Sequence, residues 1–405
     1  MPFPLSLQTS QDVKNVSIPI PTTPVSNFTP PVTPTYRGRG ESNPSLPSPI
    51  HEATPEQDAA QQKQRTVYTP LRFTDEVEIC RDPENRPVEF GRGAWSIVYK
   101  ARSSLTAPVS ELALQTPPTS PRTISRVFAV KAPSRRDARP VLQAEALTLT
   151  HLHRFPECER YVVPFHGYHA KSEMLVMSAV PLALSTFIED QADLMRKKQS
   201  TATMFDPVQG PASWRDLACK LISGLAWLHD VAGVIHGDIK SQNLLLRPVT
   251  VDESSNVASA FPYEPLYADF SSAVTISLDS TANPDTYCAS STTFTPPFTA
   301  PELLFLASLT SKDIPPTQAS DVFSLAATLL AAATGDLVLY PGSSSMQRLA
   351  MARDGHRILE FTRSGINGVR VPRNGLVEKV VQPAIAKDPA HRIDARQWLL
   401  VASSC

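Results

Sequence analysis

Three side chains with useful chemistry lie between two short apolar runs, residues 234–235 and 244–246. Asp238 can accept a proton from a hydroxyl group. Lys240 follows two residues later and can neutralise a phosphoryl oxygen, because residues two apart on an extended loop point to the same side. Asn243 can offer a neutral oxygen to a divalent metal ion. This spacing predicts a loop that brings a hydroxyl group and a phosphate together.

A turn that contains two glycines lies between two predicted strands in residues 90–101. Gly91 and Gly93 allow backbone angles that other residues avoid, and they let the backbone approach phosphate oxygens without a Cβ in the way. Ser96 and Val98 follow at the start of the second strand. Taken alone, this pattern is more typical of a plain β-turn than of a phosphate site.

A buried ion pair is predicted between a strand and a helix. Residues 127–131 form an apolar strand that ends in Lys131, and residues 138–152 show helical periodicity. Glu145 lies on the apolar face of this helix, together with Leu142 and Leu149. An unpaired buried carboxylate is costly, so Glu145 needs a cation, and Lys131 is its natural partner.

These motifs, in this order, resemble those of the eukaryotic protein kinases. Residues 236–243 resemble the catalytic loop H-R-D-x-x-x-x-N, with Gly237 in place of Arg. Residues 91–98 resemble the loop G-x-G-x-x-G-x-V, with Ser96 in place of the third Gly. Residues 127–131 resemble the strand V-A-I-K. Residues 269–271 resemble the metal-binding motif Asp-Phe-Gly, with Ser271 in place of Gly.

Further resemblance lies in the second half of the chain. Residues 295–302 are similar to the end of the activation segment of serine/threonine kinases, and residues 272–299 would form that segment. The resemblance implies that Asp321, in an apolar helix with a Ser/Asp cap, anchors the catalytic loop. It also implies that Arg392 pairs with Glu302. His236 is interpreted as a packed structural residue.

The resemblance implies a role for each candidate site residue. Asp238 would orient the acceptor hydroxyl and take its proton, Lys240 would offset charge, and Thr295 would bond both. The ATP phosphates and Mg²⁺ would be held by Lys131, paired with Glu145, and by Asn243 and Asp269. The remaining nucleotide contacts would come from the glycine-rich loop, an apolar sandwich around the adenine and the hinge backbone: Gly91, Gly93, Ser96, Val98, Ala129, Leu245, Ser178 and Val180.

The same resemblance predicts an α+β, bilobal protein-kinase-like fold, with a small mostly-β N-lobe (residues 66–180) and a larger mostly-α C-lobe (residues 181–405). Residues 1–65 are rich in Pro, Ser and Thr and are predicted to be a disordered tail. Residues 214–229 are predicted to be an amphipathic helix. Three polar insertions are expected at the surface, at residues 102–126, 191–212 and 247–265.

Composition narrows the function classes. The 405 residues carry 38 Lys and Arg against 39 Asp and Glu, a net charge of -1, so there is no electrostatic case for nucleic acid or an anionic membrane. Five scattered cysteines suggest neither a zinc site nor a disulfide framework. Neither a signal peptide nor a membrane-spanning run is recognisable. An intracellular protein, cytoplasmic or nuclear, is predicted.

The resulting hypothesis is a protein serine/threonine kinase that uses ATP and Mg²⁺ and phosphorylates protein substrates. Preference for Ser and Thr is inferred from Lys240 and Thr295. Because Gly237 replaces Arg, activity is expected not to require phosphorylation of the activation segment.

Two alternatives remain. The departures at Ser96, Gly237 and Ser271 favour a pseudokinase scaffold that binds nucleotide weakly. Six Ser/Thr-Pro pairs in and just after the tail would suit a proline-directed kinase as a partner, and a phospho-regulated docking hub built on that tail is the second alternative.

Overall fold

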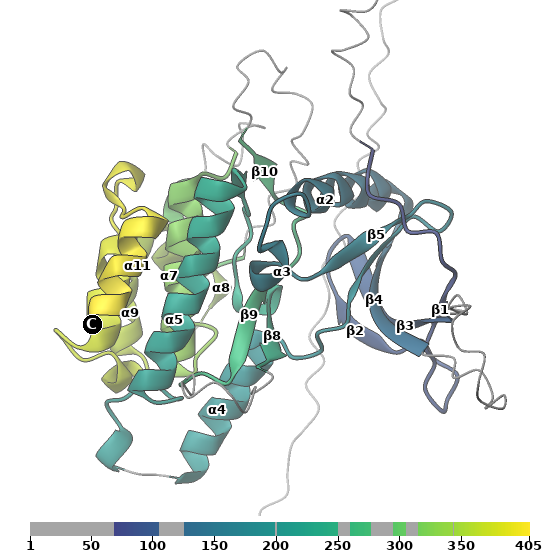
Figure 1. Ribbon diagram of the computed structural model, residues 1–405. Coiled ribbons are helices and arrows are strands. Elements are labelled where there is room, and N and C mark those ends of the chain that lie inside the picture. Colours follow the sequence, from purple (N-terminus) through teal and green to yellow (C-terminus); the bar gives the residue numbers. More distant parts are fainter. Residues whose placement is uncertain are drawn as a thin grey trace, which may run out of the picture. The chain divides into compact units, whose positions relative to one another are not determined.

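The computed structural model describes residues 69–104, 125–198, 201–249, 260–276, 295–304, 315–342 and 344–405 (Figure 1). All of them belong to one unit, Val67–Cys405. The predicted tail (residues 1–65), most of the insertion 102–126, part of the insertion 247–265 and the segment 277–294 lie outside the described residues. Among the described residues, no helix is both long and apolar enough to cross a membrane.

An antiparallel sheet forms the N-terminal region, with strand order β1-β3-β4-β6-β5 and with β2 paired to β3. β-branched and aromatic residues, which favour strands, are frequent in β1, β3 and β4. The two ends of the insertion predicted at 102–126, residues 102–104 and 125–126, belong to the sheet, because β3 and β4 pair over their full lengths. The strands are β1 (Val77–Ile79), β2 (Glu89–Arg92), β3 (Ser96–Ser104), β4 (Ser125–Pro133), β5 (Phe165–His169) and β6 (Met174–Ser178).

Helix α2 (Arg139–Leu152) packs on this sheet, as Figure 1 shows. It follows a 3₁₀ turn at Arg136–Ala138, so it begins one residue later than predicted. Its buried face consists of Leu142, Ala146, Leu149 and Leu152 together with Glu145. Glu145 is therefore held inside an apolar face, where it must find a cation.

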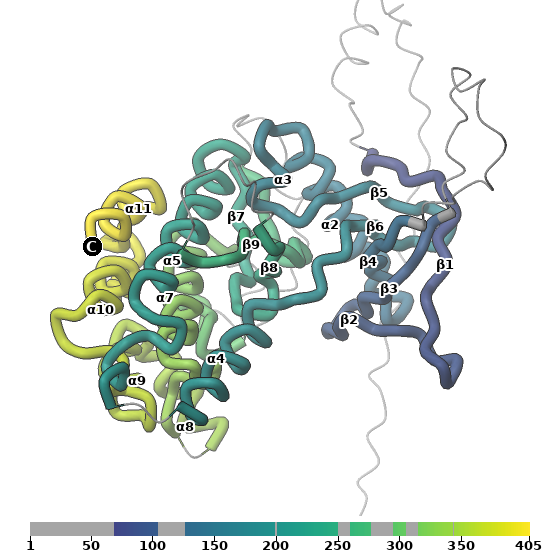
Figure 2. Tube along the Cα trace, turned by 60° about the horizontal axis from the view of Figure 1, so that its bottom comes forward, coloured from purple at the N-terminus to yellow at the C-terminus, as the bar shows by residue number. Residues whose placement is uncertain are grey.

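The C-terminal region is mostly helical and lies apart from the sheet in both views of the chain (Figures 1 and 2). The α+β, bilobal architecture predicted from the sequence is confirmed. The helices of this region are α4 (Leu184–Lys198), α5 (Pro211–Ala226), α7 (Gln318–Thr334), α8 (Ser345–Arg353), α9 (Ile358–Ser364), α10 (Leu376–Val381) and α11 (Ala395–Ser404), and the short α3 (Cys158–Tyr161) lies where the two regions meet.

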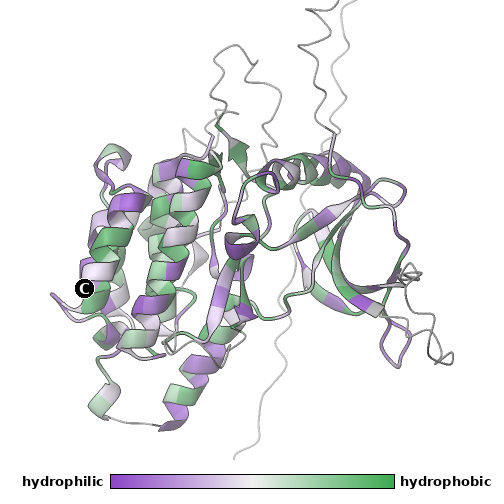
Figure 3. Cartoon of the chain, viewed as in Figure 1, coloured by the Kyte–Doolittle hydropathy of each residue, from purple (hydrophilic) through white to green (hydrophobic). Residues whose placement is uncertain are grey.

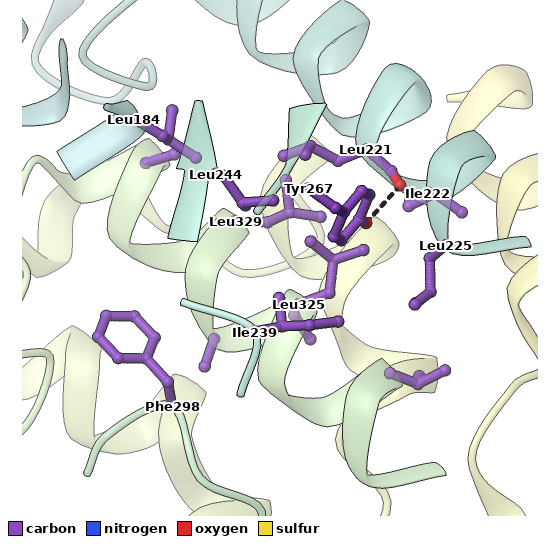
Figure 4. Close-up of a cluster of buried hydrophobic side chains, with 14 of the residues drawn as sticks. Leu184, Leu221, Ile222, Leu225, Ile239, Leu244, Tyr267, Phe298, Leu325 and Leu329 are labelled. Carbon is purple, nitrogen blue, oxygen red and sulfur yellow. Dashed lines mark hydrogen bonds between the residues drawn. The ribbon is translucent and has the colours of Figure 1, made fainter. Parts of the chain in front are cut away.

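Helix α7 is the centre of the helical region, because every residue from Ser320 to Thr334 is buried. It begins at Gln318, two residues before the predicted cap. Thr317 and Ser320 cap it reciprocally, side chain to backbone amide, so Asp321 is free to bind another segment. Leu325 and Leu329 of α7 pack with Leu221 of α5 in the apolar cluster of Figure 4. The outward faces of helices such as α4 carry the polar residues (Figure 3).

The predicted boundaries of α4 and α5 are also wrong. Residues 191–198, predicted as part of a surface insertion, form the second half of α4, because their polar side chains face outward while Leu184, Phe187 and Ile188 anchor the first half. The helix predicted over residues 214–229 begins earlier, at Pro211. Its last turn widens to π geometry over Trp227–Val231 before the chain enters β7 (Val234–Ile235).

Short strands frame the loop that follows β7. β7 pairs with β10 (Val274–Thr275), and β8 (Leu244–Pro248) pairs with β9 (Tyr263–Tyr267). The ends of the insertion predicted at 247–265 thus belong to a hairpin. Tyr267 fixes this hairpin to α5, because its hydroxyl donates to the carbonyl oxygen of Leu221 at 2.8 Å (Figure 4).

Arg392 and Glu302 form the predicted ion pair. Both terminal nitrogens of Arg392 lie 2.7 Å from the carboxylate oxygens of Glu302. The Arg392 side chain is fully buried, and it also donates to the carbonyl oxygens of Ala386 and Ala319. This bidentate pair joins the segment before α11 to the segment that follows Thr295.

Replacing Arg392 by Met should destabilise the fold strongly, because it removes a buried cation together with its bonds to a carboxylate and two carbonyl oxygens. We expect the free energy of unfolding, measured by urea denaturation, to fall by about 2–4 kcal/mol, a little below the usual cost of breaking a buried pair because Glu302 is partly exposed. The control is Arg396→Met, whose pair with Asp230 is exposed and should cost less than about 1 kcal/mol. Equal losses in the two variants would contradict this assignment.

Candidate active site

The loop after β7 is anchored by a buried carboxylate. Asp321 of α7 accepts hydrogen bonds from the backbone amides of His236 (2.7 Å) and Gly237 (2.9 Å). The imidazole Nε2 of His229 lies 3.1 Å from the same carboxylate. Because the side chain of Asp321 is only 1% exposed, these donors replace water around its charge. The loop is therefore held in one conformation by the core of the helical region.

His236 is packed inside the protein, in keeping with its interpretation as a structural residue. It is fully buried, and its Nε2 lies 3.1 Å from the carbonyl oxygen of Ala268. Its ring contacts that of Phe270, with 4.7 Å between centroids. His236 thus joins the loop that carries Asp238 to the turn that carries Asp269.

The three polar residues of the loop meet around the Asp238 carboxylate. Lys240 Nζ donates to Asp238 Oδ2 at 2.6 Å, and Asn243 Nδ2 donates to the same oxygen at 3.1 Å. Lys240 Nζ also lies 3.4 Å from the hydroxyl oxygen of Thr295, so it stands between Asp238 and Thr295. Burial raises the pKa of the Asp238 carboxyl, and the Lys240 ammonium only partly offsets this effect. A raised pKa suits a proton acceptor.

A second charged group joins the sheet, helix α2 and the turn after β9. Lys131 Nζ donates to both carboxylate oxygens of Glu145, at 2.8 and 2.6 Å, and to Asp269 Oδ1 at 2.7 Å. Glu145 also accepts from the backbone amide of Phe270 at 3.2 Å. The pair predicted from the inward position of Glu145 is thus present, and Asp269 extends it to three members.

Burial and mutual charge set the protonation of this group. Although burial acts to lower it, the carboxylates of Asp269 and Glu145 hold the pKa of Lys131 above its usual range. Burial raises the pKa of Glu145 to about 7 against the opposing effect of Lys131. Burial likewise acts to raise the pKa of Asp269, but Lys131 and a hydrogen bond from Ser271 hold it below its usual range.

Asp269 and Asn243 present oxygens that fit a metal ion held jointly with phosphate. The side chain of Asp269 is 36% exposed, whereas that of Glu145 is fully buried. The Asn243 amide nitrogen is occupied by Asp238, which leaves its carbonyl oxygen as a ligand. The backbone carbonyl oxygen of Asn243, which is distinct from its side-chain oxygen, accepts from the backbone amide of Ala268 at 2.9 Å. The two candidate ligands therefore belong to adjoining segments. No cluster of three His, Cys, Asp or Glu side chains suited to a metal occurs among the described residues.

The residues predicted to contact a nucleotide lie on two sides of the site. In the sheet, Val98 pairs with Lys131, and Ala129 lies two residues before Lys131, so the three side chains share one face. Val180 and Leu245 pack against the core of the helical region instead. The backbone amide of Ser178 donates to the carbonyl oxygen of Pro164 at 2.9 Å, so this amide is already engaged within the protein.

The glycine-rich turn is closed tightly and is fastened to the segment after β4. The amide of Gly93 donates to the carbonyl oxygen of Ser96 at 2.8 Å, and Ser96 itself is buried. Gly91 has no heavy atom within 4 Å of where a Cβ would lie. The amide of Ser134 donates to Trp95 O at 2.9 Å, and the Arg135 guanidinium lies 4.4 Å from the centre of the Trp95 ring. The sequence analysis missed this fastening, although a Trp in a glycine-rich turn was a signal for it.

Gly237 is required by its surroundings. Its φ is +80°, a conformation that favours glycine. A Cβ at this position would lie 2.5 Å from the carbonyl oxygen of Ser272 and 3.0 Å from Cγ of Pro316. The start of the segment after Asp269 therefore lies directly against the loop, and the absence of Arg at position 237 has a steric cause.

This geometry agrees with the comparison against protein families. The family described as Protein kinase domain matches residues 121–400, more than two-thirds of the chain. The chain belongs to the protein kinase family. The matched range includes Lys131, Asp238 and Asp269 but begins after the glycine-rich turn, so the pairing of β3 with β4 is what connects that turn to the site. A comparison with curated proteins finds no match.

Substituting Gly237 should destabilise the protein instead of restoring a familiar motif. We expect Gly237→Ala to lower the free energy of unfolding in urea by about 1–3 kcal/mol, because it combines a strained φ with a close backbone contact. Gly237→Arg should be at least as harmful. The matched control is Gly91→Ala, where a Cβ has open space and a smaller change, within about 1 kcal/mol, is expected. A Gly237→Ala protein as stable as the wild type would contradict the close approach to Ser272.

Proposed function

We propose that the chain is an active serine/threonine kinase that transfers the γ-phosphoryl group of ATP to Ser or Thr hydroxyls of protein substrates. One observation carries the proposal: direct side-chain hydrogen bonds hold together each of two polar groups. The first is Lys131 with the carboxylates of Glu145 and Asp269, and the second is Asp238 with Lys240 and Asn243. They adjoin each other through the bond between Asn243 and Ala268. The side chains that phosphoryl transfer would use are therefore already assembled in the folded chain, which supports an enzyme over a scaffold.

The proposed mechanism assigns one task to each side chain. Asp238 orients the acceptor hydroxyl and accepts its proton, which its raised pKa favours. Lys240, held between Asp238 and Thr295, offsets charge on the phosphoryl group during transfer. Lys131 binds the α- and β-phosphates, while Glu145 holds it in place. Asn243 and Asp269 supply oxygens to Mg²⁺, which when bound neutralises phosphate charge.

The nucleotide would lie between the sheet and the helical region. Val98 and Ala129 would cover the adenine from the sheet, and Leu245 from the opposite side. The Ser178 carbonyl and the Val180 amide would bond its edge, because the Ser178 amide already donates to Pro164. The backbone of the turn that carries Gly91, Gly93 and Ser96 would cover the phosphates.

Preference for Ser and Thr over Tyr is inferred from Lys240 and Thr295. Lys240 Nζ contacts the Thr295 hydroxyl and the Asp238 carboxylate together, so Thr295 would form one wall of the acceptor site.

The competing candidate is a pseudokinase scaffold, favoured by the departures at Ser96, Gly237 and Ser271. Each departure is accommodated locally. Ser96 is buried and closes the glycine-rich turn, and Gly237 occupies a position with no room for a side chain. Ser271 is not among the residues with positive φ and bonds Asp269. None of the three replaces a group that the proposed mechanism uses, so we favour the active enzyme.

We also propose the domain limits and setting inferred from the sequence: a tail over residues 1–65, a kinase domain over 66–405 divided near residue 180, and an intracellular location. The partners would be ATP, a protein substrate and a proline-directed kinase that acts on the tail, with neither nucleic acid nor membrane among them.

Transfer from labelled ATP with Mg²⁺ to a mixed Ser, Thr and Tyr peptide pool tests the main proposal. We expect label on Ser and Thr, and we expect Asp238→Asn to lower kcat by about 10²–10⁴, because the proton acceptor is lost. Nucleotide binding by this variant should persist, which controls for folding. A folded wild type that binds ATP and transfers nothing would support the pseudokinase, and label on Tyr alone would refute the acceptor preference.

Activity should not depend on phosphorylation of the activation segment. The reason is that Gly237 offers no cation to a phosphate, while the Lys131 group is already complete in the unmodified chain. Replacing Ser290, Ser291, Thr292 and Thr293 together by Ala should leave kcat/KM within about threefold of wild type. The control is wild-type protein treated with a phosphatase. Complete loss of activity in a folded variant would contradict the expectation.

A further inference from the structure

Ser271 contacts the carboxylate of Asp269 directly. Its hydroxyl donates to Asp269 Oδ1 at 2.7 Å. The same oxygen accepts from Lys131 Nζ, also at 2.7 Å. The resemblance to known kinases drew attention to the absence of glycine at position 271, but it did not indicate that the serine would bond the residue expected to hold the metal.

Two hydrogen-bond donors on one oxygen fix the orientation of the Asp269 carboxylate. With Oδ1 held by Lys131 and Ser271, the second oxygen of Asp269 is the one left to coordinate a cation. Rotation of the carboxyl group would break both bonds at once. The side chain is 36% exposed, so an ion can approach the carboxyl group from solvent.

The backbone around this bond is held on both sides. Asp269 has a φ of +63°, which is unfavourable for a residue with a side chain and must be maintained by its surroundings. Phe270, between the two bonded residues, is 1% exposed and packs on His236. The Ser271–Asp269 bond therefore ties the carboxylate to a short turn that cannot easily rotate.

We propose that Ser271 is a positioning residue for the metal-binding carboxylate: its hydroxyl holds Asp269 in the orientation that coordinates Mg²⁺ with the nucleotide. This inference rests on the proposed function, because it assumes that Mg²⁺ and ATP bind at this site. Lys131 is also needed by the phosphates, whereas Ser271 can hold Oδ1 throughout. Glycine at this position would permit the same turn but would leave the carboxylate with one donor fewer.

The experiment measures metal dependence of nucleotide binding, so it does not need phosphoryl transfer. The affinity for the β,γ-imido analogue of ATP is determined by calorimetry over a series of MgCl₂ concentrations in the full chain. For Ser271→Ala we expect the Mg²⁺ concentration that gives half of the affinity gain to rise about three- to tenfold, as for the loss of one typical intramolecular hydrogen bond. Affinity without Mg²⁺ should stay within about twofold of wild type.

Two further variants separate the hydroxyl from other effects. Ser271→Thr keeps a hydroxyl and should behave like wild type. Ser271→Gly restores the residue that is usual in the family but lacks the hydroxyl. Its half-effective Mg²⁺ concentration should therefore rise as much as that of Ser271→Ala. It also provides the measurement if the alanine protein does not fold.

The outcomes distinguish this inference from the proposed function. If the wild type shows Mg²⁺-dependent binding and the alanine and glycine variants match it, the role of Ser271 is overturned while the proposed function stands. A threonine variant that shifts as far as alanine would also overturn it. A folded wild type without Mg²⁺-dependent nucleotide binding would overturn the proposed function and this inference together.

Discussion

Lys131 is a buried cation, only 4% exposed. The arrangement of the two lobes depends on the carboxylates that neutralise its charge. A buried ammonium is stable only when ionised partners replace the water that it loses. Glu145 supplies one partner from α2, and Asp269 supplies the other from the turn after β9. One cation therefore sets the position of the helix on the sheet and ties the sheet to the helical region. Because Lys131 and Glu145 are each costly to bury alone, neither is stable in the interior without the other.

The same principle operates twice more in the helical region. Asp321 is buried in α7 and accepts hydrogen bonds from the backbone of the loop that carries Asp238, so its charge can be accommodated only if that loop adopts its observed path. Arg392 is buried near α11 and takes its acceptors from Glu302 and two carbonyl groups. Each buried charge thus holds an irregular segment that has few hydrogen bonds of its own. The apolar body of α7 supplies the rigid support against which these segments are placed.

The departures from the usual kinase motifs have physical reasons that belong to this chain. At position 237 a side chain would collide with the backbone at Ser272, so glycine allows two segments to pack more closely than Arg would. At position 271 a serine hydroxyl reaches the carboxylate next to it, which a glycine does not do. Trp95 brings the glycine-rich turn against Arg135 by ring stacking. Substitutions that look like losses in a motif are, in the folded chain, contacts with other partners.

Much of the site was predictable from the sequence, because it follows from residue types at fixed spacing. Asp238, Lys240 and Asn243 lie within one short loop, and helical periodicity alone puts Glu145 on a buried face that demands Lys131 as its partner. The ends of α4 and α5 were misjudged, because polar residues that face solvent continue a helix as readily as they form a loop. Three features depended on the tertiary structure: Asp269 as a second partner of Lys131, the bond from Ser271 and the lack of room at Gly237. The first and third depend on how the sheet, the loop after β7 and the turn at residues 269–272 pack together, and local sequence does not specify such distances. The bond from Ser271 is local, but it forms in a turn whose positive φ at Asp269 is maintained by the surrounding structure.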